Sequence, residues 1–145
     1  MPFCSRFLPA AVAGLLFATG AAGAVNAPEL YPGTYVQIDT VTKKPLQPGN
    51  RVVFVRSKDG SFGFSINAIR ALDSNQGYVA GRFRPGRVVV WSQKSEAGDC
   101  KLTLTAIPHG MMVVQDTKFG DCGFGYGVVA DGTYALEGEK PLPKT

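Results

Sequence analysis

The residues best suited to bind a phosphate lie in a glycine-rich stretch around one cysteine. Residues 119–134 are FGDCGFGYGVVADGTY. A phosphate-binding loop needs a helix after its glycines, because the amides at the helix N-terminus face the anion. Here the glycines precede VVADGTYAL, a run typical of a strand, and no Lys-Ser/Thr pair follows them. The pattern therefore favours a structural role, in which glycines permit positive φ angles and close backbone approach beside a disulfide.

The tripeptide Gly-Asp-Cys occurs twice, at 98–100 and 120–122. A bridge between Cys100 and Cys122 would bring Asp99 and Asp121 close together. Two carboxylates can bind Ca²⁺ or act as an acid–base pair, but a calcium site needs more oxygen ligands than this region offers. The alternative is that each aspartate caps a turn before a strand. We expect no metal and no cofactor, and these aspartates remain the weak metal candidates and the one route to a carboxylate-dependent hydrolase.

His109 is the only histidine, and it lies between Pro108 and Gly110 at an expected turn. A catalytic triad would need a serine and an acid beside it, and the sequence has no nucleophile-elbow motif. Zinc would need further histidine or cysteine ligands. A copper site with the following Met111 and Met112 is less favoured than a strand start with at least one methionine buried. The sequence therefore predicts a protein that is not an enzyme.

A basic hairpin is the surface feature with the strongest binding signature. Two arginines share one face of an expected strand, Pro85-Gly86 forms a turn, and a third arginine begins the returning strand, which carries the only tryptophan. Arginine beside an aromatic side chain is a frequent composition of binding hot spots. The alternative is a charged hairpin that keeps a sheet edge from pairing, with the tryptophan in the core. The binding candidates are Arg82, Arg84, Arg87 and Trp91, with Arg70 expected nearby.

The N-terminal region predicts export. Arg6 precedes the uncharged apolar run FLPAAVAGLLFATGAAGA, and small residues offer cleavage near Ala24 or Ala27. We expect residues 1–27 to be a signal peptide and 28–145 a single domain with a loose tail at 138–145, periplasmic or secreted and without a membrane span. Cys100 and Cys122 would remain, and an even count in an exported chain indicates a disulfide. It would close a loop of about twenty residues, contributing about 3 kcal/mol.

Short apolar runs separated by turn signals predict an all-β fold. Asp-Gly and Pro-Gly pairs lie between runs rich in valine, phenylalanine and threonine, several of which alternate apolar and polar residues. We expect about eight antiparallel strands in a small lipocalin-like barrel or a two-sheet sandwich. GTYVQIDTVTKKP and GTYALEGEKP resemble each other, which indicates that the first and last strands pair. The expected strands are 33–40, 51–56, 61–68, 78–84, 87–93, 100–107, 111–116 and 128–136.

The run from Cys100-x-Leu-x-Leu to CGFGYGVVADGTY resembles small secreted β-domains of Gram-negative bacteria. In general design the chain is also similar to periplasmic inhibitors of lysozymes and proteases. This resemblance implies a non-enzymatic protein that occupies a protein partner, as an inhibitor or immunity protein does. The net charge is +4, or +3 without Arg6, which disfavours a strongly basic partner and is too modest for nucleic acid. The alternative is a lipocalin-like carrier of a small hydrophobic ligand.

Overall fold

Among the residues that the structure describes, the alternating apolar runs of the sequence form eight strands. The computed structural model describes residues 27–70, 72–73, 75–95, 98–116, 122–125 and 127–138. The expected signal peptide lies outside these residues except for Ala27, and so does the expected tail except for Gly138. The strands are β1 (Gly33–Ile38), β2 (Arg51–Arg56), β3 (Phe62–Arg70), β4 (Asn75–Phe83), β5 (Val88–Ser95), β6 (Gly98–Ile107), β7 (Gly110–Gln115) and β8 (Gly132–Leu136).

The strand faces agree with the alternation in the sequence. Phe62, Phe64 and Ile66 of β3 are buried. Cys100 and Leu102 of β6 are likewise buried, so the cysteine points inward as expected. The largest boundary difference is in β8, which begins at Gly132 rather than residue 128. Residues 128–131 are irregular because side chains rather than a neighbouring strand satisfy part of their backbone, as described below.

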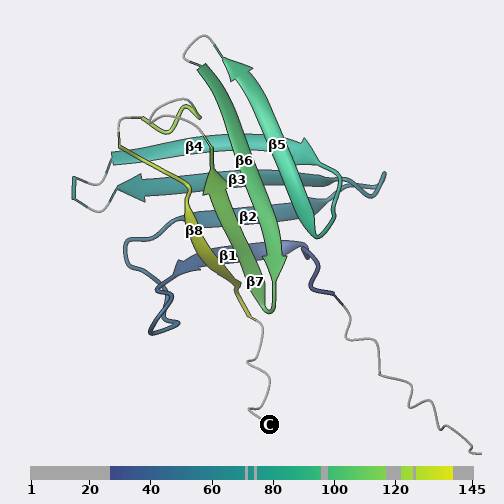
Figure 1. Ribbon diagram of the computed structural model, residues 1–145, viewed down its shortest axis with the longest axis horizontal. Helices are drawn as coiled ribbons and strands as arrows, with labels where there is room; N and C mark the ends of the chain where they lie inside the picture. The colour runs from purple at the N-terminus through teal and green to yellow at the C-terminus, as the bar shows by residue number, and fades with distance from the viewer. Residues whose placement is uncertain are drawn as a thin grey trace, which may run out of the picture.

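All eight strands form one antiparallel sheet in the order β4-β3-β2-β1-β8-β7-β6-β5. The first and last strands pair, with Tyr35 opposite Leu136, which confirms the expectation from their similar sequences. Figure 1 shows β1–β4 running side by side and β5–β8 crossing them, so the sheet folds over itself into a nearly closed barrel. The two edges of this sheet are β4 and β5.

The expectation that β4 and β5 form a hairpin is wrong. Among the described residues, only β3 pairs with β4 and only β6 pairs with β5, although residues 84–87 connect the two strands directly. The connection carries the chain from one layer of the barrel to the other, so the strands diverge instead of continuing side by side (Figure 1). Arginines placed on a hairpin by the sequence therefore lie at a corner of the barrel.

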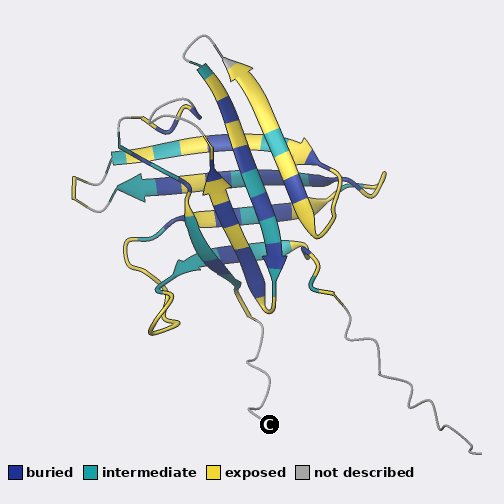
Figure 2. Ribbon diagram, in the orientation of Figure 1, coloured by how far each residue is buried: buried dark blue, intermediate teal, exposed yellow. Residues whose placement is uncertain are grey.

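Aromatic side chains occupy the interior of the barrel. The Phe54 ring lies 5.0 Å from the Tyr35 ring and 5.2 Å from the Phe83 ring, measured between centroids. Phe64 and Trp91 form an edge-to-face pair at 4.9 Å, a favoured arrangement for aromatic rings. Figure 2 shows the corresponding alternation of buried and exposed residues along the strands. The core therefore spans both layers and holds the folded sheet together.

Candidate functional site

Arginine and lysine side chains gather at one end of the barrel. The β2–β3 turn and the β4–β5 connection lie at this end, as Figure 1 shows. The residues concerned are all exposed. Two of them, in β2 and in the β2–β3 turn, were missed by the sequence analysis because their proximity depends on the pairing of β2 with β3. We call this the cationic end, and it consists of Arg56, Lys58, Arg82, Arg84 and Arg87.

Two arginines of the cationic end are fixed by neighbours. Arg82 donates hydrogen bonds to Ser57 Oγ at 2.6 Å and to Ser61 Oγ at 3.5 Å. The guanidinium of Arg56 lies 5.2 Å from the centroid of the Phe62 ring, where a cation and an aromatic face attract each other. These contacts hold both positive charges over the end of the core.

Asp59 is an acidic neighbour of this end. Its carboxylate accepts hydrogen bonds from the Ser61 hydroxyl at 2.6 Å and the Ser61 amide at 3.0 Å. These bonds, followed by the positive charges of Arg82 and Arg84, hold the pKa of Asp59 below its ordinary value. The ionised carboxylate therefore orders the turn and offsets one of the positive charges.

Arg84 and Arg87 are exposed, and no hydrogen bond or ion pair to another residue of the described ranges holds either side chain. They flank Pro85-Gly86 in the connection between β4 and β5. Their guanidinium groups can therefore meet a carboxylate or phosphate without first breaking an internal contact. Because arginine presents a rigid fork of donors to such groups, these two residues are the best available contacts for an anionic partner.

Trp91 lies apart from this exposed surface. Its ring is half-buried and packs against the core, edge-to-face with Phe64. A side chain at Gly81 of β4 would lie 2.7 Å from the indole, so the glycine makes room for the ring. Trp91 thus spans the seam between the two edge strands. This arrangement favours the core interpretation of Trp91 over its interpretation as a binding anchor.

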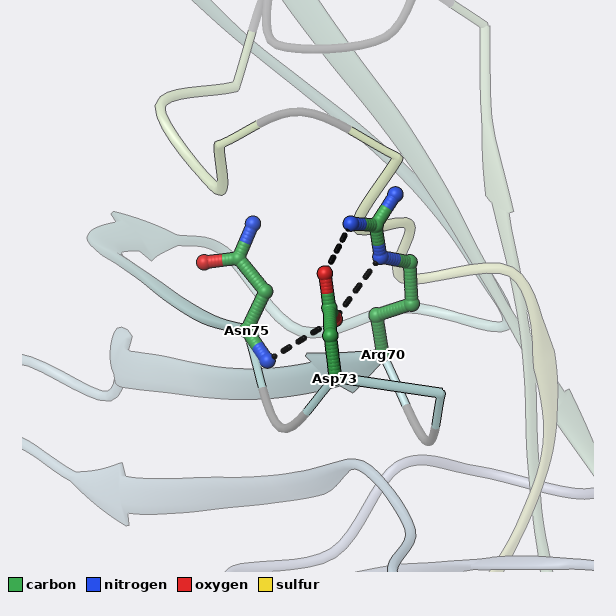
Figure 3. A network of polar contacts seen from close by, with 3 residues as sticks. All are labelled: Arg70, Asp73 and Asn75. Carbon is green, nitrogen blue, oxygen red and sulfur yellow. Dashed lines mark hydrogen bonds and ion pairs between the residues drawn. The ribbon is translucent and has the colours of Figure 1, made fainter.

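Arg70 is at the opposite end of β3 from Arg82, so the expectation that it lies near the other arginines is wrong. The register pairs Arg70 with Asn75 but places Arg82 opposite Gly63. Figure 3 shows the Arg70 guanidinium against the Asp73 carboxylate, which also accepts the Asn75 amide. The hydrogen bond from Arg70, followed by that from the Asn75 amide, lowers the pKa of Asp73 to about 2. This contact belongs to the β3–β4 turn.

The disulfide joins Cys100 of β6 to Cys122, as predicted. The S–S distance is 2.01 Å and both cysteines are buried. The bridge ties the glycine-rich segment to the barrel wall. Asp99 is exposed in β6, but Asp121 lies outside the described residues. The expected proximity of the two carboxylates therefore stays a prediction.

The glycine-rich segment packs as a structural element. Gly123, Gly125 and Gly127 have positive φ angles of 76°, 88° and 70°, which favour glycine. The backbone of buried Phe124 lies against Gly77 of β4, so closely that a side chain at Gly77 would collide with it. The segment therefore covers part of β4, as the bend-and-close-approach interpretation expects.

Buried polar side chains close the end of the barrel opposite the cationic end. Asn50 donates to the Val129 carbonyl at 2.9 Å and to Tyr134 Oη at 3.1 Å, and accepts the Ile69 amide at 2.8 Å. Tyr134 in turn donates to the Ala130 carbonyl at 2.7 Å. Burial raises the pKa of Tyr134, so its hydroxyl stays protonated and keeps this donor role.

A second pair of contacts fixes the same segment. Gln115 Oε1 accepts the Ala130 backbone N–H at 2.9 Å, and the Gln115 backbone N–H donates to the Asp131 carboxylate at 2.5 Å. No sequence pattern indicated these polar residues, because an isolated asparagine or glutamine gives no sign of burial. We call this the hydrogen-bonded end, and it consists of Asn50, Gln115, Ala130, Asp131 and Tyr134.

A cavity of about 560 Å³ lies outside the barrel, under the loop between β1 and β2. Its apolar lining includes Ile38, Leu46 and Leu136. Lys43 and an exposed ion pair between Arg51 and Glu137, 3.2 Å apart, form its polar part. The cavity is therefore a candidate binding site for a small ligand, and this site is separate from the barrel interior.

His109 lies at the β6–β7 turn with a φ of 64° and is exposed. Met111 is buried and Met112 is exposed, as expected for the start of a strand. Within the described ranges, no group of three histidine, cysteine or acidic residues could hold a metal ion. No helix in those ranges is long and apolar enough to cross a membrane.

Comparisons of the chain with protein-family models, curated proteins and solved structures find no match. The candidate site is therefore defined by its own geometry. Of the four binding candidates from the sequence, three arginines lie together at the cationic end, and Trp91 packs into the seam beside it.

Proposed function

We propose that this protein is a non-enzymatic binding protein that occupies an acidic protein partner through its cationic end. The observation that carries the proposal is the pair Arg84 and Arg87, two exposed guanidinium groups beside two fixed ones at Arg56 and Arg82. Clustered positive charge steers an acidic partner and selects against basic ones. Periplasmic inhibitors, which the sequence resembles in design, act by this kind of occupation, and so do immunity proteins.

The proposed location is the periplasm or the extracellular space. A buried disulfide is consistent with an oxidising compartment, where such bonds persist. The N-terminal apolar run and its small-residue cleavage positions support export by the secretory route. The partner would then be a protein of the cell envelope or of the surroundings.

A carrier of a small hydrophobic ligand is the second candidate, and the outer cavity of about 560 Å³ is the observation that favours it. The barrel interior itself is filled by aromatic rings in mutual contact. A carrier would therefore use the cavity under the β1–β2 loop. Native mass spectrometry of the purified protein tests this directly, because a carrier retains a small molecule of defined mass.

Partner capture tests the proposed function. The oxidised protein, expressed from the 145-residue sequence, is immobilised and exposed to a cell-envelope extract. The test variant is Arg84→Glu/Arg87→Glu, which leaves the hydrogen-bonded Arg82 in place. The matched control is Lys43→Glu/Lys44→Glu, which changes the net charge equally at exposed residues of the β1–β2 loop.

We expect the wild type and the lysine control to retain the same protein and the arginine variant to lose it. Raising the salt concentration should also weaken capture. Exposed charges are largely screened beyond the Debye length, which is about 8 Å at physiological ionic strength and becomes shorter as salt is added. Equal capture by all three forms would contradict the assignment of the cationic end. Retention of a small molecule without any protein would favour the carrier.

A further inference from the structure

β5 is an edge strand whose free side carries unpaired backbone groups. The Ala106 amide donates to the Arg87 carbonyl at 2.8 Å, which fixes the alternation of the β5–β6 ladder. In an antiparallel pair, every second residue bonds to the neighbour and the residues between them face the other way. Within the described ranges, no strand pairs with that other side. The residues whose amide and carbonyl groups face this free edge are Val88, Val90, Ser92 and Lys94.

The outer face beside this edge is apolar. Val88 and Val90 are 56% and 59% exposed. Threonines of β6 lie next to them in register, followed by Met112 and Val114 of β7, which are 42% and 45% exposed. Figure 2 shows β5 exposed along most of its length. An exposed edge with apolar side chains is a template for pairing with another strand.

Natural sheets usually protect such an edge with charged residues, proline or a covering segment. Residues 88–92 of β5 are VVVWS and contain neither a charged residue nor a proline, so Lys94 is the only charged residue among those that face the free edge of this strand. The contacts at β4 lie on its inner face: a side chain at Gly81 would meet the Trp91 indole and one at Gly77 would meet the Phe124 backbone, on the side of the strand that buries Val79. Within the described residues, the run from Val88 to Ser92 is therefore a stretch of free edge that an added strand could occupy.

The charges beside β5 indicate the chemistry of that occupant. Arg87 directly precedes Val88, and Arg84 lies in the same connection; both are exposed. A strand laid along β5 would therefore end beside two guanidinium groups. Carboxylates at that end of the added strand would complement them. A second copy of this chain is disfavoured, because its own cationic end would add positive charge to the pair.

We propose that β5 accepts an extended segment of the protein partner as an additional strand. The apolar side chains of that segment lie on Val88 and Val90, and acidic residues at its end pair with Arg84 and Arg87. Strand addition of this kind takes affinity from main-chain hydrogen bonds and specificity from alternate side chains. This inference rests on the proposed function and specifies how the partner is held.

A displayed library of random peptides, each about ten residues long, provides the probe. Selection on the wild-type protein should enrich peptides with apolar residues at alternate positions and aspartate or glutamate near one end. Hydrogen exchange supplies an independent readout. The bound peptide should slow exchange of the Val88, Val90 and Ser92 amides, while the Val89 amide, already paired with β6, should change little.

Two variants remove the edge in different ways. Val90→Pro deletes an amide that faces the free edge and leaves the β5–β6 ladder intact. Val88→Lys/Val90→Lys keeps the backbone and adds charge to the edge, so it remains informative if the proline variant folds poorly. The matched control is Val114→Lys, which alters the same outer face but an interior strand. We expect each edge variant to weaken peptide binding about tenfold or more and the control to retain it.

The outcomes separate this inference from the proposed function. Loss of the envelope partner in Arg84→Glu/Arg87→Glu, with full retention in both edge variants, would overturn strand addition and leave the proposed function standing. Equal weakening by Val114→Lys, or failure to enrich any alternating peptide, would also overturn strand addition. A dimer of the wild type that becomes monomeric in Val88→Lys/Val90→Lys would assign the edge to a second copy and overturn the acidic occupant.

Discussion

The two ends of the barrel use polar residues in opposite ways. At the hydrogen-bonded end, Asn50 and Gln115 are buried and hold an irregular backbone segment in place. At the cationic end, the side chains of Arg84 and Arg87 are exposed, and no hydrogen bond to the other described residues holds either guanidinium group. Buried polar groups are costly to leave unpaired, whereas exposed charges contribute little to stability. The comparison assigns stability to one end and recognition to the other.

The disulfide should produce the largest effect on stability. Cys100→Ser/Cys122→Ser frees the segment that the bridge ties to β6, across a sequence separation of 22 residues. We expect the free energy of unfolding to fall by about 3 kcal/mol, measured by denaturant titration. The wild type treated with a reductant should show the same loss. Unchanged stability in both would mean that the segment is held by its other contacts alone.

Asn50→Ala should have the next largest effect. The substitution leaves the Ile69 amide and the Val129 carbonyl without their side-chain partner. We expect a loss of about 2 kcal/mol, because an unsatisfied buried polar group costs about 1–3 kcal/mol. Asn67→Ala is the control, since Asn67 is exposed in β3. Equal losses in the two variants would contradict the structural role that the buried contacts assign to Asn50.

The loss of stability at low pH should depend on the Arg70–Asp73 contact. The pKa of Asp73 is about 2 in the folded protein, below the value of about 3.9 expected for an unfolded chain. The unfolded chain therefore binds the proton more readily, and stability is lost as pH falls from about 4 towards 2. Asp73→Asn should remove this part of the pH dependence of the unfolding midpoint. Asp99→Asn, at an exposed carboxylate, should retain it; identical acid profiles for wild type and Asp73→Asn would refute the contact.

Arg84→Glu/Arg87→Glu should have the smallest effect on stability. Both side chains are exposed, and surface substitutions usually change the free energy of unfolding by less than about 0.5 kcal/mol. The melting temperature should therefore remain close to that of the wild type while partner capture is lost. A large drop in melting temperature would place these residues in the fold rather than in recognition.

The local alternation of apolar and polar residues predicted most of the fold, but not the arrangement of the edge strands β4 and β5. The faces of β3 and β6, the disulfide and the pairing of β1 with β8 follow from apolar periodicity, cysteine count and sequence similarity. The divergence of β4 and β5 could not be predicted, since Pro85-Gly86 suits a hairpin as well as a corner. The contact that identifies the corner, Trp91 over Gly81, joins different strands.

The candidate site was predicted in part for the same reason. Arg82, Arg84 and Arg87 are close in sequence, and a local pattern therefore grouped them. The positions of Arg56 and Arg70 depend on the register of β2, β3 and β4. This register places Arg56 at the cationic end and Arg70 at the opposite end. The burial of Asn50 depends on residues far along the chain and left no local signal.

The most direct test of the central claim compares partner capture with melting temperature in the same preparations of wild type, Arg84→Glu/Arg87→Glu and Lys43→Glu/Lys44→Glu. The account predicts nearly equal melting temperatures for the three proteins and capture of the same acidic protein by the wild type and the lysine variant alone. Capture of that protein by the arginine variant at wild-type strength would contradict the claim that the cationic end is the recognition surface.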